Sequence, residues 1–228
     1  MKKPLLKIIS AMLILTLWIL LVACAAETEI SAVNTEDIPL MIDVSPDDWF
    51  YHYVMTGLRF GLIEDVGDGH FEPDRNVTRA EFITMLGRLH EYGNETIGTP
   101  GVGEIYTRYL DWAVETGLTQ SNVHGDLMPN AYINREQMAM IVFRYIEAFE
   151  LRAYFASYWG VGMALFSDYR EMSHDAVGPI EFLRGRLLVH GAPGHYFRPR
   201  DNATRAEALE ILARICSAVY DLKHPMGH

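Results

Sequence analysis

The chain has 228 residues, of which 30 are acidic and 19 are lysine or arginine, and its formal net charge at pH 7 is −11. Nucleic acid and anionic membrane surfaces are poor candidates for its partners, because both repel a protein of this charge. Even without a leader and a short tail, the chain is long enough to form one substantial hydrophobic core.

The first 23 residues are predicted to form a lipoprotein signal peptide. Three lysines precede an apolar run that ends in Leu21-Val22-Ala23-Cys24, an order typical of signal peptides. Leu-Val-Ala-Cys resembles the bacterial lipobox, so Cys24 is the predicted lipidation site. The alternative is an uncleaved transmembrane anchor, because the run is nearly long enough to span a bilayer. In both cases the rest is exported and tethered. Cleavage would change the formal charge from −11 to −14, because three lysines and no acids are lost.

Residues 24–40 are small, polar and acidic, and they predict a flexible spacer. A first repeat is expected over residues 41–93. Its first helix begins near Ser45-Pro46-Asp47, because apolar residues then follow at helical spacing. These apolar residues are Trp49, Tyr53, Val54, Leu58 and Leu62.

The second helix of this repeat has a clear start signal. Thr78 and Glu81 have the spacing of a capping box, in which each side chain accepts a hydrogen bond from the other residue's backbone amide. The apolar positions that follow predict an amphipathic, core-facing helix. They are Phe82, Met85, Leu86 and Leu89.

The stretch that leads into this helix occurs three times, as residues 71–81, 127–137 and 197–207. In each copy a proline precedes an arginine by six residues, and Glu or Gln follows a Thr or Asn by three. The chain is therefore divided into a linker at 94–103, a second repeat at 104–150, a third repeat at 166–220 and a tail at 221–228. The lone cysteine of the third repeat, Cys216, lies in an apolar helical register and is expected to be buried.

Residues 151–165 form an insert between the second and third repeats. Four aromatic residues are concentrated there, namely Tyr154, Phe155, Tyr158 and Trp159. The insert could be a sugar-stacking surface, a contact with an exported protein partner, or a helix extension and loop packed on the body.

The three repeats resemble the S-layer homology domain. The resemblance rests on Phe71-Glu-Pro-Asp with Val-Thr-Arg-Ala-Glu81, and on Phe197-Arg-Pro-Arg with Ala-Thr-Arg-Ala-Glu207. It implies an all-α, pseudo-threefold fold, in which the first helices form a central three-helix bundle and the second helices project, with ligand grooves between neighbours. The second loop glycine of the family is present only in the third repeat, as Gly191.

The resemblance also implies non-catalytic binding of a secondary cell-wall polysaccharide through a pyruvylated amino sugar. A helix N-terminus offers amides and partial positive charge to the sugar's carboxylate, and an arginine adds a bidentate donor. Capping explains the Thr and Glu of the motif but not its arginine. The predicted carbohydrate-binding residues are therefore Arg79, Arg135, Arg205, Trp49, Glu81 and Glu207. Among the motif arginines, the first expectation is Arg79 with Trp49 and Glu81, the second is Arg205, and the last is Arg135.

Other functions are less well supported by the sequence. A metal site is not expected, because His174, His190 and His195 lack compact ligand spacing, and no cofactor is expected. A wall hydrolase is disfavoured, because the repeats leave no room for a separate catalytic domain. The main alternative is an exported protein-interaction scaffold whose degenerate repeats no longer bind glycan. The preferred hypothesis is an envelope protein, lipid-anchored at Cys24 and facing the cell wall.

Overall fold

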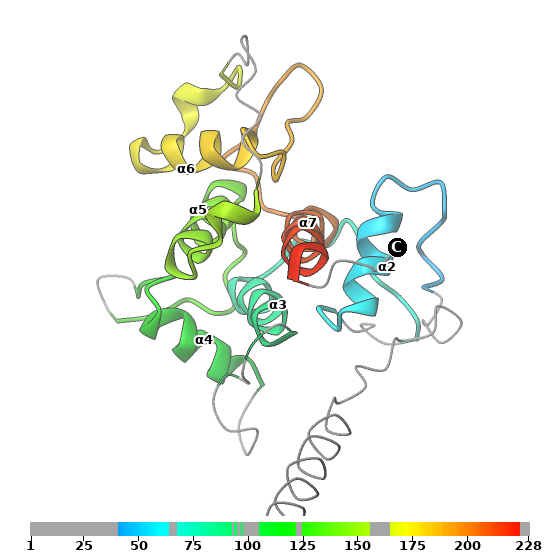
Figure 1. Cartoon of the computed structure of the whole chain (residues 1–228). Coiled ribbons are helices and arrows are strands. Elements are labelled where there is room, and N and C mark those ends of the chain that lie inside the picture. Colours follow the sequence, from blue (N-terminus) through cyan, green and yellow to red (C-terminus); the bar gives the residue numbers. More distant parts are fainter. Residues whose placement is uncertain are drawn as a thin grey trace, which may run out of the picture. The chain divides into compact units, whose positions relative to one another are not determined.

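The computed structural model (Figure 1) describes residues 41–63, 68–92, 94, 97, 105–121, 125–155 and 165–223. The chain divides into two compact units, Met1–Asp37 and Ile38–His228, and the description concerns the second unit. The predicted signal peptide with Cys24, the spacer, most of the 94–103 linker and most of the aromatic insert lie outside the described residues.

The described residues contain helices and isolated β-bridges but no strand, which confirms the predicted all-α class. None of the helices in these ranges is long and apolar enough to cross a membrane. The α-helices are α2 (Tyr51–Arg59), α3 (Arg79–Tyr92), α4 (Ile105–Glu115), α5 (Arg135–Ala148), α6 (His174–Arg184) and α7 (Arg205–Lys223), and the 3-10 helices are η2 (Leu151–Tyr154) and η3 (Tyr169–Glu171).

The helices that begin with the repeated motif, α3, α5 and α7, lie at the centre of this unit (Figure 1). Tyr145 of α5 is buried there and contacts His90 of α3, and Cys216 of α7 is buried as expected. On the outside, α4 packs on α3, α6 on α5 and α2 on α7. The burial pattern agrees, because α5 buries eight of its 14 residues and α2 only two of nine. The expectation for the two helix types was therefore wrong: the second helices are central and the first helices are peripheral.

The turns before the three central helices are joined by a closed ring of backbone hydrogen bonds. The amide of Val77 donates to the carbonyl of Ala203, Ala203 donates to Ile133, and Ile133 donates to Val77, at 2.9, 2.9 and 3.0 Å. All three residues are fully buried. The ring fixes the three helix starts against each other, so side chains from different turns can meet.

Two aspartates hold the Phe-x-Pro turns in place. The carboxylate of Asp43 accepts hydrogen bonds from the amides of Phe71 and Glu72, both at 2.7 Å. Asp168 accepts in the same way from Phe197 and Arg198, at 2.8 and 2.7 Å. The second residue of each turn is left-handed, with φ of 56° at Glu72 and 59° at Arg198, an unusual state for a side-chain-bearing residue. Two charge-assisted bonds at each turn offset its cost.

Candidate ligand pocket

The amides at the starts of the central helices already have partners. The first amide of each helix donates to a carbonyl of a neighbouring turn, from Arg79 to Ala131, from Arg135 to Asp201 and from Arg205 to Arg75. The second amides donate in the same way to the carbonyls of the three motif prolines, Pro129, Pro199 and Pro73. The expectation that these helix N-termini offer free amides to a carboxylate was therefore wrong. Any anion recognised here must bind side chains.

The predicted capping pairs are confirmed. The Thr78 amide donates to Glu81 at 2.8 Å, and the Glu81 amide donates back to the Thr78 hydroxyl at 3.2 Å. Thr204 and Glu207 make the same pair of bonds at 3.1 and 3.2 Å. Asn134 and Gln137 form the third box. In each box the third helical amide is also satisfied.

Two of the motif arginines have structural partners that the sequence analysis did not foresee. The Nε of Arg135 donates to the carbonyl of Phe197 at 2.7 Å, and the Nε of Arg205 donates to that of Phe71 at the same distance. Each guanidinium lies 5.0 Å from the centre of that phenylalanine ring, and each arginine is 7% exposed. Folding therefore gives a reason for arginine at this turn, contrary to the argument that capping leaves it unexplained.

Arg79 is placed differently from the other two. Its Nη2 donates to the hydroxyl of the buried Thr119, while its buried Nε has no hydrogen-bond partner. Burial lowers the pKa of Arg79, and the positive charge of Arg144 lowers it further. No carboxylate lies within ion-pair distance of Arg79 in the described part of the chain. Among the described residues, the positive charge of Arg79 is therefore not balanced by an ion pair.

Trp49 and Arg135 line a pocket of about 470 Å³, which we call the Trp49 pocket. Trp49 stands just before α2 and is 57% exposed. Arg135 begins α5, and Glu207 and Glu210 come from the first turns of α7. The remaining lining residues are His190, Gly191, Ala192, Pro193 and Arg198. Three predicted site residues, Trp49, Arg135 and Glu207, therefore meet in one pocket.

Charges alternate across the Trp49 pocket. The Oε1 of Glu207 lies 2.6 Å from Nη1 of Arg135 and 2.7 Å from Nη2 of Arg198. Burial lowers the pKa of Arg135, an effect that the Glu207 carboxylate opposes. Burial would also raise the pKa of Glu210, but His190 and Arg214 bond to its carboxylate and hold the pKa below its usual value. The pocket thus presents both donors and acceptors to a polar ligand.

The grouping of residues differs from the expected one. Trp49 was expected with Arg79 and Glu81 of its own repeat, but it meets Arg135 and Glu207 from the other two. Glu81 instead caps α3 and pairs with Arg75 at 2.8 Å. Arg79, Glu81 and Arg205 are absent from the lining of the Trp49 pocket.

Residues 190–193 form a loop that lines the pocket and was not predicted to be part of the site. A Cβ on Gly191 would lie 2.8 Å from the Phe166 ring and 3.0 Å from the carbonyl of Tyr196, so the loop requires glycine there. The carbonyl of His190 also accepts a hydrogen bond from Arg135 at 3.3 Å. The presence of this glycine in only one repeat was the available signal that this groove differs from the other two.

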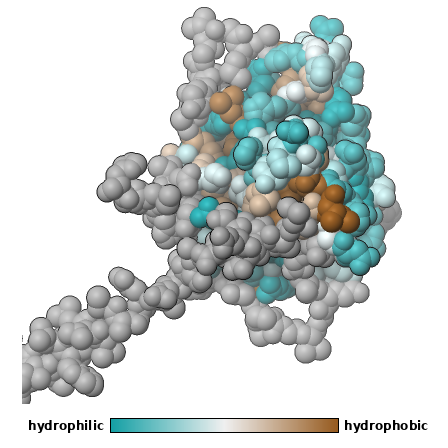
Figure 2. Space-filling model, turned by 90° about the vertical axis from the view of Figure 1, so that its right-hand side faces the viewer, coloured by the Kyte–Doolittle hydropathy of each residue, from teal (hydrophilic) through white to brown (hydrophobic). Residues whose placement is uncertain are grey.

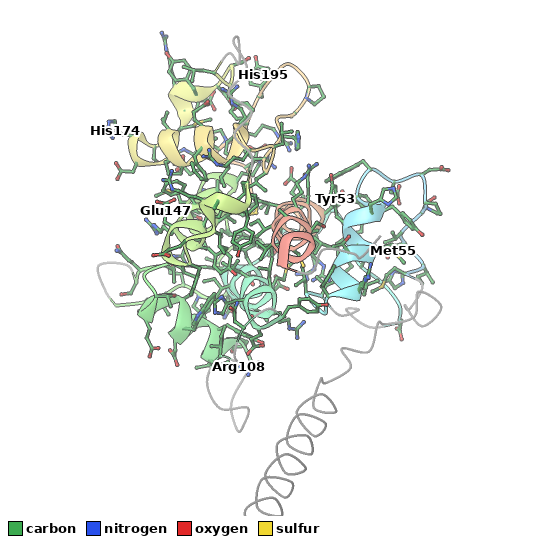
Figure 3. All side chains as sticks on the ribbon, in the orientation of Figure 1. Tyr53, Met55, Arg108, Glu147, His174 and His195 are labelled. Carbon is green, nitrogen blue, oxygen red and sulfur yellow. The ribbon has the colours of Figure 1, made fainter. Side chains whose placement is uncertain are left out.

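No group of three or more His, Cys, Asp or Glu side chains in the described ranges is arranged to hold a metal ion. His174 lies at the exposed start of α6 and His195 in the loop beyond that helix (Figure 3). His190 contacts Glu210 at 3.3 Å.

Comparison with known proteins finds two segments of this chain that are similar to a known domain. Residues 43–83 and 165–209 match the model of the S-layer homology domain. Two segments are therefore similar to S-layer homology domains. These segments include Trp49, Arg79, Glu81, Arg205 and Glu207. The second predicted repeat, with Arg135, lies outside both matched segments, so the count of three repeats stays a prediction.

Similar proteins include surface-layer and anchoring proteins. The chain is 29% identical over 170 residues to an amylopullulanase of Thermoanaerobacterium thermosulfurigenes, 23% over 176 residues to the S-layer protein sap of Bacillus anthracis and 23% over 169 residues to a cellulosome-anchoring protein of Acetivibrio thermocellus. These alignments cover 73%, 75% and 70% of this chain but only 9%, 20% and 36% of the relatives. The similarity to the enzyme thus concerns a small part of it.

Proposed function

We propose that this protein is a non-catalytic module that binds cell-wall polysaccharide, with the Trp49 pocket as its main site. The observation that carries the proposal is the meeting of an exposed tryptophan with Arg135, Arg198 and Glu207 in one pocket. The similarity to S-layer homology segments and to proteins named for surface layers and anchoring supports it.

The lining of the Trp49 pocket suits a sugar. The C–H face of a sugar ring is apolar and can pack on the exposed ring of Trp49, while its hydroxyls need both donors and acceptors, which the pocket supplies. A pyruvyl ketal on an amino sugar would add a carboxylate. Arg198 is 45% exposed at its side chain and can turn toward such a group, because its Glu207 partner is also held by Arg135.

The two other motif arginines are proposed as weaker sites. Arg79 has no ion-pair partner among the described residues and lies near the positive charge of Arg144, which would favour an anionic sugar. Arg205 is buried against Phe71, and one of its terminal nitrogens has no hydrogen-bond partner. We infer a pseudo-threefold arrangement of three repeats, supported by the cyclic pattern of turn-to-turn hydrogen bonds. Its grooves differ in charge and in aromatic residues, so they are not equivalent sites.

We further propose that Cys24 carries lipid and tethers the protein to the outer face of the membrane. The signal-like residues 1–23 and the sequence Leu-Val-Ala-Cys support this. The protein would then link membrane and wall. Replacement of Cys24 by alanine should leave unacylated precursor, and unchanged processing would contradict the tether.

The experiment for wall binding is co-sedimentation with purified sacculi. The purified protein should pellet with intact sacculi and stay in solution once the secondary polysaccharide is extracted from them. Failure of a folded sample to pellet would contradict the proposal. Capture of one exported protein without any wall material would instead favour the protein-interaction scaffold.

The surface character fits a polar ligand better than an apolar partner. On the α2 side of the molecule, most of the described surface is hydrophilic, and hydrophobic residues occupy a smaller part of it (Figure 2). A large protein interface usually has a more continuous apolar centre.

A further inference from the structure

A second cavity, of about 520 Å³, lies farther along α7 and we call it the distal pocket. It lies beside α2 and close to the end of η2. Its lining residues are His52, Tyr53, Thr56, Tyr154, Phe155, Arg186, Leu187, Leu188, Ala213, Arg214, Ser217 and Ala218. Neither the proposed main site nor the motif arginines account for it.

The same three segments line both pockets in the same order. On α7, Glu207 and Glu210 face the Trp49 pocket, and Arg214 and Ser217 continue the same helical face into the distal pocket. Before and along α2, Trp49 is followed by residues 52, 53 and 56 at helical spacing. On the opposite side, residues 190–193 line the first pocket and residues 186–188 the second. The two cavities therefore follow one another along α7, and we call the two together the groove.

A bonded group of side chains lies where the two pockets adjoin. Arg214 donates to the hydroxyl of Tyr53 and to the carboxylate of Glu210 at 3.0 Å, and Glu210 also contacts His190 at 3.3 Å. Tyr53 lies on the side of α2 that faces α7 (Figure 3). The groove from Glu207 to Ser217 is roughly 15 Å long at 1.5 Å per helical residue. It is therefore longer than one sugar ring.

The distal pocket, like the first, is lined by both aromatic and polar groups. Tyr154 and Phe155 supply rings, and Ser217 supplies a hydroxyl. Arg186 stacks on Phe182 at 3.6 Å and has a buried Nε without a hydrogen-bond partner. Phe155 is 7% exposed and belongs to the core, while Tyr154 packs against that core but is only half-buried, so its exposed part can contact a ligand.

We propose that this groove binds a single polysaccharide chain over both pockets, with a terminal sugar at Trp49 and a following sugar of the same chain at Tyr154. The inference rests on the proposed wall binding and extends it to a ligand longer than one unit. The order of the lining segments along α7 and the presence of aromatic and polar groups in both pockets favour one sugar chain over two unrelated ligands.

The test is calorimetric binding of size-fractionated polysaccharide fragments released from purified sacculi. Longer fragments should bind the purified protein about 10-fold more tightly than the shortest one, since each 1.4 kcal/mol is tenfold. Tyr154→Ala should remove this gain in affinity and leave the affinity for the shortest fragment unchanged. Ser217→Phe, which would fill the distal pocket, should act in the same way. Tyr132→Ala, at an exposed tyrosine outside both pockets, is the control.

The possible failures are distinguishable. If no fragment binds the wild-type protein, the proposed function itself is contradicted. If fragments bind equally at all lengths, or if both distal variants keep the gain with length, the two-pocket groove is overturned while wall binding stands. If the folded Tyr154→Ala and Ser217→Phe proteins no longer bind even the shortest fragment, the two-pocket groove is also overturned.

Discussion

The guanidinium of Arg135 lies 2.6 Å from the carboxylate of Glu207, and this pair joins the start of α5 to the start of α7. Both residues belong to copies of one sequence motif, and both line the Trp49 pocket. Glu207 caps its own helix with one oxygen and holds Arg135 with the other. One ion pair therefore serves the packing of the turns and the chemistry of the pocket.

Arg135 should matter more for stability than Arg79. Arg135→Ala removes the ion pair and the bond to the Phe197 carbonyl, and leaves Glu207 with fewer partners in a buried site. We expect a loss of about 3 kcal/mol in the free energy of unfolding. Arg79→Ala should cost about 1 kcal/mol, because among the described residues the Arg79 side chain bonds to Thr119 and has no ion-pair partner. Urea denaturation of both variants checks this, and equal losses would contradict it.

Asp168 should be required for the third Phe-x-Pro turn. It is 5% exposed and accepts from the amides of Phe197 and Arg198. Asp168→Ala leaves both amides without these bonds, and we expect a loss of about 3 kcal/mol. Asp111→Ala, on the exposed face of α4, is the matched control and should stay within about 0.5 kcal/mol of wild type. Thermal or urea unfolding that gives both variants the same loss of stability would contradict this role of Asp168.

Gly87 should be needed where α3 packs on α4. A Cβ there would lie 2.2 Å from the Tyr109 ring, which is 1% exposed and is fixed by a bond from its hydroxyl to Glu91 at 2.8 Å. Gly87→Ala should therefore lower the free energy of unfolding by about 1–3 kcal/mol. Gly178→Ala is the control, because nothing lies within 4 Å of its Cβ position. An alanine there should be close to neutral, because the helix propensity of alanine is offset by the crowding of its Cβ against the ring of Pro179. A neutral Gly87→Ala would contradict the close approach.

The sequence predicted the helical class and the caps, because periodicity and capping depend on local spacing. Thr78 with Glu81 is readable from four residues. The central position of α3, α5 and α7 could not be predicted from the sequence, because the first and second helices of each repeat are both amphipathic. The grouping of Trp49 with Arg135 also could not be read from local spacing, because the ring of turns brings distant segments together. The prediction that the helix N-termini offer free amides was wrong for the same reason, because the amides bond to carbonyls of neighbouring turns.

Acid should destabilise the protein through three carboxylates. Burial would raise the pKa values of Asp43, Glu81 and Glu210, but bonds from backbone amides, Arg75, His190 and Arg214 outweigh burial and lower them. A carboxylate with a lowered folded-state pKa contributes its full stability above its usual pKa, which is 4.5 for the glutamates, and loses it as pH falls through the folded-state value. The free energy of unfolding should therefore fall below about pH 4.5. Glu210→Gln should flatten this fall, and an unchanged slope would contradict the role of Glu210.

The central claim is tested most directly by the affinity of Trp49→Ala for the wall polysaccharide, measured beside Tyr132→Ala. The two rings are 57% and 56% exposed, but only Trp49 lines the pocket. Loss of a stacking ring worth about 1.4 kcal/mol weakens binding tenfold. Trp49→Ala should therefore bind wall polysaccharide at least about 10-fold more weakly while Tyr132→Ala binds like wild type. Equal affinities of the two folded variants would contradict the assignment of the Trp49 pocket as the polysaccharide site.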